Sequence, residues 1–526
     1  MEKEELQTID QSKFEFIQRD ETIFDQKFET KKIGFLQDAL IRFSKNKGSV
    51  VAFVILCLLI LFSIFTPMFS KYEVNVYDMK YRDVLPKAFE AGTGFWDGTK
   101  KVTENEQKYD YFHAIGAASD EISREEYTSR DGIHVVNVTY IFDSYEIGYY
   151  FKDFKQSEFQ EIWEHDQTCS EEDRILYPLV DENWIQNIPV DHPVLSKPSD
   201  KNNPMSPTYR ELIQNAEGAL LNLYANDANY FFAVDNKNRA IYDDNGDLVT
   251  LYKTASASDV YKDENGYLLA EPNGGVMATR VLYKNYYKYL HGSIPKFLFG
   301  TDGSGRDLLV NIAAGGRLSL ALGFGVSLIN IILGIIYGAI EGYYGGVTDL
   351  VMERIVEVLS EVPFMIVATL FQLHLAEKVG ALPSLLFAFV LTGWIGTAGR
   401  TRMQFYRYKG QEYVLAARTL GAKDSRLIAK HILPNAVGPI ITSSVLMVPG
   451  VIFSESMLSY LGIIDFGAAN ITSIGLILNR ASKNWNNYPH QLFFPALFVS
   501  LLMICFNIFG NGLRDAFNPS LRGVDE

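Results

Sequence analysis

The 526-residue sequence has few cysteines and lacks the motifs of common hydrolytic sites. Two of its three cysteines, Cys57 and Cys505, fall in apolar runs, and Cys169 stands alone in a polar region, so no disulfide can cross-link that region internally. The sequence contains no Walker lysine motif, no paired-histidine ligand set and no nucleophile elbow. His374 and His431 are isolated and are expected to be packing or surface residues. We therefore expect no catalytic residue, cofactor or metal, and a chain that is not an enzyme.

Basic residues are in short supply over one long stretch of the chain. Residues 71–295 hold 22 Lys/Arg against 38 Asp/Glu, whereas the remainder of the chain holds 26 against 25. The formal net charge of −15 therefore resides almost wholly in this stretch, which argues against nucleic-acid binding. A stretch of roughly 225 residues is long enough to bury a hydrophobic core of its own.

The polar sequence is interrupted by six apolar runs: 50–69, 318–340, 358–375, 382–398, 439–461 and 493–509. At a rise of about 1.5 Å per residue, each run can cross the roughly 30 Å hydrocarbon core of a bilayer with some tilt. The first run follows a long polar tail, so we interpret it as a retained span rather than a cleaved signal peptide. Six spans place both termini on the same side of the membrane.

The segment between the fourth and fifth runs is strongly basic. Residues 399–438 carry eight Lys/Arg against two acids, and such an excess in a short loop marks the cytoplasmic side. Parity then places the two termini and the 341–357 loop on that side as well. Arg42, Lys45 and Lys47, just before the first run, agree with this orientation, whereas the 341–357 loop offers only Arg354.

Part of this loop has the pattern of two short helices. Residues 412–435 read EYVLAARTLGAKDSRLIAKHILPN. Small or apolar residues at i, i+3, i+6 and i+7 share one helical face: Val414, Ala417, Leu420 and Gly421. Gly421 can end the first helix in a left-handed conformation, Asp424 is suited to be the N-cap of the second, and Pro434 marks its expected limit. A cytoplasmic partner could grip such a knob; a merely solvated basic loop is the alternative that periodicity leaves open.

The same loop resembles a known family motif. Glu412, Ala416, Ala417 and Gly421 stand at the spacing E-x3-A-A-x3-G, followed by HILPN at 431–435. This resembles the "EAA" coupling loop of ATP-binding cassette (ABC) importer permeases, in the version of the C-type subunit of oligopeptide/dipeptide permeases. Three further segments are similar to that subunit: 299–320, 342–363 and 506–519. The resemblance covers about residues 33–70 and 297–522, and it does not cover 71–295.

The resemblance implies an all-α polytopic membrane protein of the ABC importer type I permease fold, with six transmembrane helices and an inserted α+β extracytoplasmic domain. It implies a multi-pass permease of the bacterial plasma membrane that moves oligopeptides or dipeptides into the cell by alternating access. The implied partners are a second permease subunit, two ATP-binding cassette ATPase subunits and an extracytoplasmic substrate-binding protein, in addition to the peptide and membrane lipid. ATPase coupling would fall on the matched loop: Glu412, Ala416, Ala417, Gly421 and Asp424.

Two alternatives stand beside this interpretation. Related permeases differ in cargo, so nickel or short glycans could replace peptides. A membrane receptor with a ligand-sensing outer domain is the rival from another class of protein. A receptor would not need the spacing of the coupling loop or six spans with glycine-lined packing.

Three features of the apolar runs carry expectations of their own. Gly334, Gly338 and Gly342 recur at four-residue spacing along the second span and just past its apolar run, which lets another helix approach closely; conformational tolerance without a partner is the alternative. Pro363 is expected to kink the third span.

Glu455 lies in the fifth run, where a carboxylate should face protein or water rather than lipid. It is a candidate pathway residue, and a structural hydrogen-bonding role is at least as well supported.

The acidic stretch has strand, turn and helix signals. Residues 134–151 predict two strands, and residues 157–165 predict a short helix. Residues 189–207 are rich in proline and predict a linker. Thr208 and Glu211 predict a capping box at the start of another helix. Residues 230–270 predict a β meander with Asn-Gly turns at 245–246 and 265–266. The acidic cluster at 243–247 is expected to be a hairpin tip rather than a calcium loop, because Leu248 stands where an EF-hand requires glycine.

The expected organisation begins with a cytoplasmic N-terminal tail (1–49, with 1–32 mobile) that carries an interfacial helix at 33–43; continuation of that helix into the first span is the alternative left open. The first span (50–69), the extracytoplasmic insert (70–296), the permease core (297–517, coupling loop 399–438) and a cytoplasmic tail (518–526) follow. The insert holds 22 of the 30 tyrosines, and tyrosine suits interfaces. We therefore expect the insert to dock a partner or gate the pathway; tyrosines that serve only its own core are the alternative.

Overall fold

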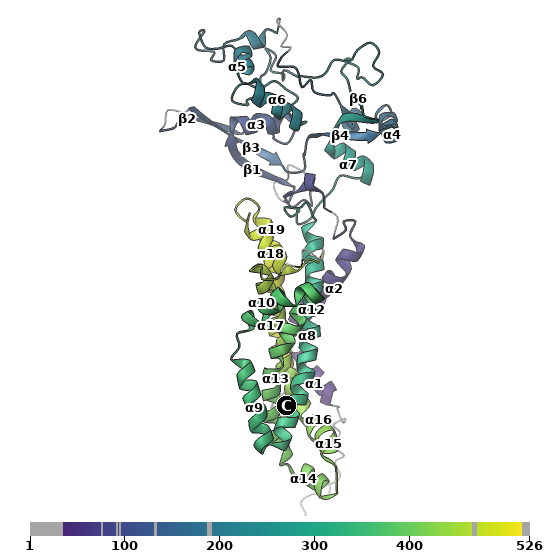
Figure 1. Ribbon diagram of the computed structural model, residues 1–526, viewed down its shortest axis with the longest axis vertical. Coiled ribbons are helices and arrows are strands. Elements are labelled where there is room, and N and C mark those ends of the chain that lie inside the picture. The colour runs from purple at the N-terminus through teal and green to yellow at the C-terminus, as the bar shows by residue number, and fades with distance from the viewer. Residues whose placement is uncertain are drawn as a thin grey trace, which may run out of the picture.

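The computed structural model describes residues 35–517 except 75–76, 91–92, 94–95, 131–133, 187–191, 465 and 467–470. The expected tails at 1–34 and 518–526 lie outside the described residues. Figure 1 shows a long bundle of helices with an α+β region at one end, and α14 at the opposite end. The two ends of the bundle are called the insert end and the α14 end below.

The bundle is built from two segments that flank the insert in sequence. Its elements are α1 (Phe35–Lys45), α2 (Lys47–Phe69), α8 (Leu308–Tyr344), α9 (Gly346–Ser360), α10 (Phe364–His374), α11 (Ala376–Val379), α12 (Ala381–Gly393), α13 (Ile395–Lys409), α14 (Glu412–Thr419), α15 (Asp424–Arg426), the π-helical turn η6 (Leu427–Ile432), α16 (Leu433–Ser444), α17 (Met447–Tyr460), α18 (Ile474–Ser482) and α19 (Pro489–Ala516). A break at Asn46, whose side chain accepts a hydrogen bond from Ser49 N at 3.2 Å, separates α1 from α2.

Five helical stretches among the described residues are long and apolar enough to cross a membrane: 47–69, 308–344, 381–409, 424–460 and 489–516. Helices α9 and α10 become a sixth span only if they are counted together, and they are bent by 74° at the break before Phe364. The expected 341–357 loop is wrong, because α8 continues to Tyr344 and α9 starts at Gly346. The bend expected at Pro363 is confirmed, but it separates α9 from α10 instead of kinking one continuous 358–375 helix, because proline supplies no N–H to continue the helical ladder.

The insert contains two antiparallel sheets. The first has the order β1-β3-β2, with β1 (Thr99–Asn105), β2 (Ser123–Thr128) and β3 (His134–Asp143). The second has the order β4-β7-β5 with β6 also paired to β7, and consists of β4 (Tyr149–Lys155), β5 (Leu176–Tyr177), β6 (Ala270–Asn273) and β7 (Val276–Leu282). The helices are α3 (Glu106–Ala114), α4 (Gln156–Asp166), α5 (Tyr209–Asn215), α6 (Glu217–Asn226) and α7 (Tyr283–His291), with short 3₁₀ turns η3 (Met79–Tyr81), η4 (Glu171–Asp173) and η5 (Val194–Ser196).

Most local expectations for the insert hold. The two strands of 134–151 correspond to β3 and β4, the short helix to α4, and Thr208 and Glu211 form the capping box of α5. The 230–270 meander is wrong as a set of strands, because the chain there is held by isolated bridges such as Phe232 with Thr250 and Tyr242 with Leu248. The carboxylate of Asp243 accepts hydrogen bonds from the backbone N–H groups of Asn245 and Asp247, as a hairpin tip requires.

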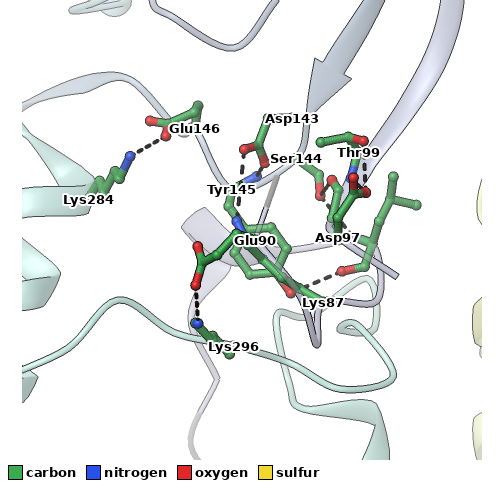
Figure 2. Close-up of polar contacts among 12 residues, drawn as sticks. Lys87, Glu90, Asp97, Thr99, Asp143, Ser144, Tyr145, Glu146, Lys284 and Lys296 are labelled. Carbon is green, nitrogen blue, oxygen red and sulfur yellow. Dashed lines mark hydrogen bonds and ion pairs between the residues drawn. The ribbon is translucent and has the colours of Figure 1, made fainter. Parts of the chain in front are cut away.

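The base of the insert is fastened to the segments that enter and leave the bundle (Figure 2). The hydroxyl of the buried Tyr145 donates to the carbonyl of Leu85 at 3.0 Å and lies 3.3 Å from the amide nitrogen of Phe297. The Nζ of Lys296 donates to Glu90 at 2.6 Å, and Lys87 covers the Tyr145 ring at 4.4 Å. The segment after α2 and the segment before α8 therefore meet on one side chain from the insert.

Candidate functional site

The candidate site is the turn between the helices that end at Lys409 and begin at Leu433, at the α14 end of the bundle (Figure 1). Helix α14 covers Glu412–Thr419, and Gly421 follows with φ +83°. This is the left-handed conformation expected of a glycine that ends a helix. Helix α15 then turns the chain back toward the bundle. We call residues 412–432 the knob.

The knob has one face on the bundle and one face open. Val414 is fully buried and Ala417 packs beside it against the cluster that includes Tyr343 and Phe405. Glu412, Ala416 and Gly421 are exposed, and Leu420 at the tip is 88 % exposed. The small apolar face expected at Val414, Ala417, Leu420 and Gly421 is therefore divided: its first two members serve this chain's own core, and only the last two face outward.

Two expected details of the knob are wrong. Asp424 is the first residue of α15 rather than its N-cap, a position that Lys423 takes with an extended backbone; the Asp424 carboxylate instead accepts a hydrogen bond from Tyr343. Pro434 does not end the second helix, since the helical path continues to Tyr460. The preceding turn is π-helical, with the N–H of Leu433 bonded to the carbonyl of Ile428, and this wider winding admits a proline that cannot donate to the ladder.

The knob is tied to the end of α8 through one tyrosine. The Tyr343 hydroxyl donates to Asp424 Oδ1 at 2.6 Å and accepts from Arg418 Nη2 at 3.2 Å. The Arg418 guanidinium also lies 5.7 Å from the Tyr343 ring centroid. One residue from each short helix of the knob thus meets the same side chain of α8.

The three glycines of α8 face α13. A Cβ on Gly334 would lie 2.6 Å from the Thr397 Cβ, one on Gly338 would lie 2.2 Å from the Ala398 carbonyl oxygen, and one on Gly342 would lie 2.7 Å from the Phe405 Cβ. Distances below about 3 Å leave no room for any side chain. The stripe lets the backbones of α8 and α13 approach within this chain, so the approach needs no partner subunit.

An ion network beside this stripe was not foreseen from the sequence. Arg402 on α13 bonds both oxygens of Asp349 at 2.6 and 2.9 Å, bonds Glu353 at 3.0 Å, and lies 3.5 Å from Glu341. The Tyr406 hydroxyl donates to Asp349 as well, at 2.8 Å. The cluster fixes α9 to α13 at the α14 end. The only signal in the sequence was an acidic segment beside a basic one, without the pairing.

Glu455 lies on α17 and is fully buried. Its carboxylate accepts hydrogen bonds from the hydroxyls of Ser319 at 2.7 Å, Ser459 at 3.0 Å and Ser456 at 3.4 Å. Ser319 belongs to α8, so the carboxylate joins two helices. This environment fits the structural role that the sequence left open, and it places the carboxylate among side chains of this chain.

One group of potential metal ligands occurs among the described residues: His165, Asp166 and Cys169, whose ligand atoms lie within 4.8 Å of one another. The Asp166 carboxylate already accepts backbone hydrogen bonds from Ile175 at 3.0 Å and Leu176 at 2.7 Å. These bonds hold the end of α4 against β5. They account for the buried carboxylate without an ion.

Comparison with known proteins gives matches that flank the insert, and one of them extends to residue 86, into the stretch that the resemblance was not expected to cover. Residues 330–523 match the protein family described as binding-protein-dependent transport system inner membrane component. Residues 34–86 match the family described as N-terminal TM domain of oligopeptide transport permease C. The oligopeptide transport system permease protein OppC of Bacillus subtilis is 43% identical over 225 residues, which is 43% of this chain and 72% of that protein. The dipeptide transport system permease protein DppC of the same organism is 41% identical, over 43% of this chain and 69% of the relative.

More distant matches are of the same kind. OppC of Escherichia coli (strain K12) is 38% identical over 228 residues, covering 43% of this chain and 72% of that protein. A solved structure of the inward-facing MetNI methionine ABC transporter aligns with 40% of this chain and 96% of its own, at 14% identity and a TM-score of 0.33. The OppC and DppC relatives and the two family models favour a permease over the receptor alternative, and peptide systems over nickel or glycan systems.

Proposed function

The chain belongs to the OppC/DppC-type permeases of ABC peptide importers, and from this premise we propose that its knob receives the movement of partner ATPases. It is a non-catalytic, multi-pass inner membrane subunit of a binding-protein-dependent oligopeptide/dipeptide transport system. The partners in our proposal are a second permease subunit, two ATP-binding cassette ATPases and an extracytoplasmic substrate-binding protein. ATP-driven closure of the ATPases then shifts the permease between two membrane states with opposite access.

The observation that carries this proposal is the exposure of Leu420. A leucine side chain that is 88 % exposed leaves apolar surface in water, at a cost of about 1.5–3 kcal/mol relative to burial. It stands at the tip of the knob, next to the exposed Gly421, while the base of the knob is bonded to Tyr343 of α8. An apolar tip suits insertion into a groove of a partner protein. Because the base of the knob is hydrogen-bonded to α8, a movement of that partner would be transmitted to α8.

Substitution at the tip tests this proposal. We expect Leu420→Glu to abolish substrate-stimulated ATP hydrolysis and peptide uptake in the reconstituted transporter, because the groove would have to desolvate a carboxylate. Leu420→Met is the matched control, because it keeps an apolar side chain of similar volume at the tip of the knob. If Leu420→Glu hydrolyses ATP and transports like the parent, the knob is not the coupling element.

We further propose that the α14 end faces the cytoplasm and the insert faces outward, where it docks the substrate-binding protein or gates the pathway. The basic 399–438 loop supports this orientation, and the acidity of the insert suits the attraction of a basic partner or cationic peptides. Replacing 71–290 by a short linker tests the docking role, since binding-protein association and uptake should both be lost. Raising the salt concentration should weaken the association of the parent. If association and uptake survive the replacement, the docking role is wrong.

A further inference from the structure

A hollow of about 340 Å³ opens in the insert, near the point where the insert meets the bundle. Its walls come from the β1–β3 sheet, from α3 and from Tyr230, and Tyr488, in the turn that precedes α19, lines another side. The volume lies in the range of small-molecule sites, which is about 300–1,000 Å³. A ligand in this hollow would touch the insert and the permease core at once.

The walls are aromatic, with one unmatched charge. Aromatic side chains supply most of the lining: Tyr111, Phe112, Tyr140, Phe142, Tyr230 and Tyr488. At the rim, Lys108 is paired with Glu104 at 2.9 Å. The half-buried Lys100 has no carboxylate within 4 Å in the part of the chain that the structure describes, and its Nζ lies 5.4 Å from the centroid of the Tyr488 ring. Lys100 differs from the exposed lysines of the insert in that its ammonium group is half-buried in the lining of a hollow.

The strand register explains why this lysine points into the hollow. On β1, residues 100, 102 and 104 share the face that lines the hollow, because successive side chains of a strand alternate between its faces. Lys101 is the next residue and is exposed on the opposite face. Burial lowers the pKa of Lys100, and the Glu104 carboxylate on the same face of β1 offsets this only in part, so the charged form is incompletely compensated. A bound anion would supply that compensation.

We propose that this hollow binds the carboxylate end of a short peptide, with Lys100 paired to the carboxylate and the aromatic walls holding an apolar C-terminal side chain. This inference rests on the proposed function as a peptide permease, and it adds a recognition site outside the helical bundle. A carboxylate against a half-buried ammonium forms a charge-assisted hydrogen bond. Aromatic walls bury the adjoining side chain and exclude water, which strengthens that pair. The site would hold cargo between the insert and the start of α19.

Binding to the transporter complex in lipid nanodiscs, without its binding protein, tests this inference. The probes are the dipeptide Ala-Phe, its C-terminal amide, acetate and inorganic phosphate, each titrated by calorimetry. We expect Ala-Phe to bind at least about tenfold more tightly than the amide, the ratio that one charge-assisted hydrogen bond gives. Acetate and phosphate should bind weakly, because neither fills the aromatic hollow. Equal affinity for the amide, or no binding of Ala-Phe at millimolar concentration, would overturn the proposal, as would phosphate that binds as tightly as Ala-Phe.

Two lysine variants make the test specific to the site. We expect Lys100→Met to reduce Ala-Phe affinity to that of the amide, and Lys101→Met, on the outer face of the same strand, to bind like the parent. Lys100→Arg keeps the charge and should keep the preference for the free carboxylate, which separates lost recognition from lost folding. Parent-like binding by Lys100→Met would sink the proposal. Uptake of Ala-Phe by cells that carry the complete system tests the permease function separately, since uptake by the parent without binding in the hollow refutes only this inference.

Discussion

The hydroxyl of Tyr343 lies 2.6 Å from Oδ1 of Asp424, although the two residues are 81 positions apart in the chain. Tyr343 stands in the last turn of α8, and Asp424 opens the second helix of the knob. Helix α8 runs along the bundle from the knob to the segment next to the insert (Figure 1). This bond therefore joins the knob, the proposed coupling element, to the longest of the described helices of the permease core.

Removing the Tyr343 hydroxyl should loosen this link. In Tyr343→Phe the Asp424 carboxylate and the Arg418 guanidinium both lose a partner, and a hydrogen bond to a charged group contributes about 1.5–3 kcal/mol. We expect ATP hydrolysis to continue while the peptide transported per ATP falls several-fold, measured in proteoliposomes. Tyr344→Phe is the control, because Tyr344 is 56 % exposed. An unchanged ratio in Tyr343→Phe would show that the link does not carry the coupling.

Bulk at the glycine stripe should separate α8 from α13. In Gly338→Leu even the first side-chain carbon would lie 2.2 Å from the Ala398 carbonyl oxygen, and overpacking of this kind costs about 1–3 kcal/mol. We expect a lower unfolding temperature of the purified subunit in detergent and a reduced yield of assembled complex. Gly325→Leu on the same helix is the control, since its Cβ meets nothing within 4 Å. Equal stability of the two variants would contradict the packing role.

The insert should lose stability as the pH rises from about 4 to 7. Burial, with the neighbouring Glu106 carboxylate, raises the pKa of Asp110 to about 7 from its usual 3.8. The folded state therefore holds a proton between these values that the unfolded state releases, so the free energy of unfolding falls as the pH rises from about 4 to 7. Asp110→Asn should remove this slope. Amide exchange of the Ala240 N–H, which donates to Asp110 at 3.2 Å, reports it locally: protection should fall with pH in the parent and stay level in the variant.

The features that the sequence predicted are those set by local pattern. Apolar run length located five of the six expected spans, the left-handed Gly421 followed from helix-ending chemistry, and Thr208 with Glu211 followed from a capping box. The features that it missed depend on neighbours distant in the chain. Nothing around Pro434 indicates the π-helical turn that lets the helix continue, and the acids near α9 gave no sign that three of them meet Arg402.

The candidate site shows the same limit. The motif spacing picked out the knob, but spacing treats Ala417 and Gly421 alike, whereas packing against Tyr343 and Phe405 turns Ala417 inward and leaves Gly421 exposed. Periodicity identifies a helical face without saying which face has a partner in the same chain. The hydrogen bond from Tyr343 to Asp424 was hidden for the same reason, because its two residues come from separate elements.

Gly421 should tolerate only residues that accept a left-handed backbone. Its φ is +83° and a Cβ there meets nothing within 4 Å, so the obstacle to substitution is the backbone conformation rather than space. Gly421→Val places a β-branched residue in this region, at a cost of about 1–2 kcal/mol or more, which should shift Leu420 and uncouple ATP hydrolysis from uptake while the subunit still inserts. Gly421→Asn is the matched variant, because asparagine enters the left-handed region readily, and we expect it to retain most transport. The comparison of substrate-stimulated ATPase activity in proteoliposomes separates the two explanations: if valine and asparagine are equally harmful, the outward face of the knob excludes any side chain at 421, and the conformation is not what matters.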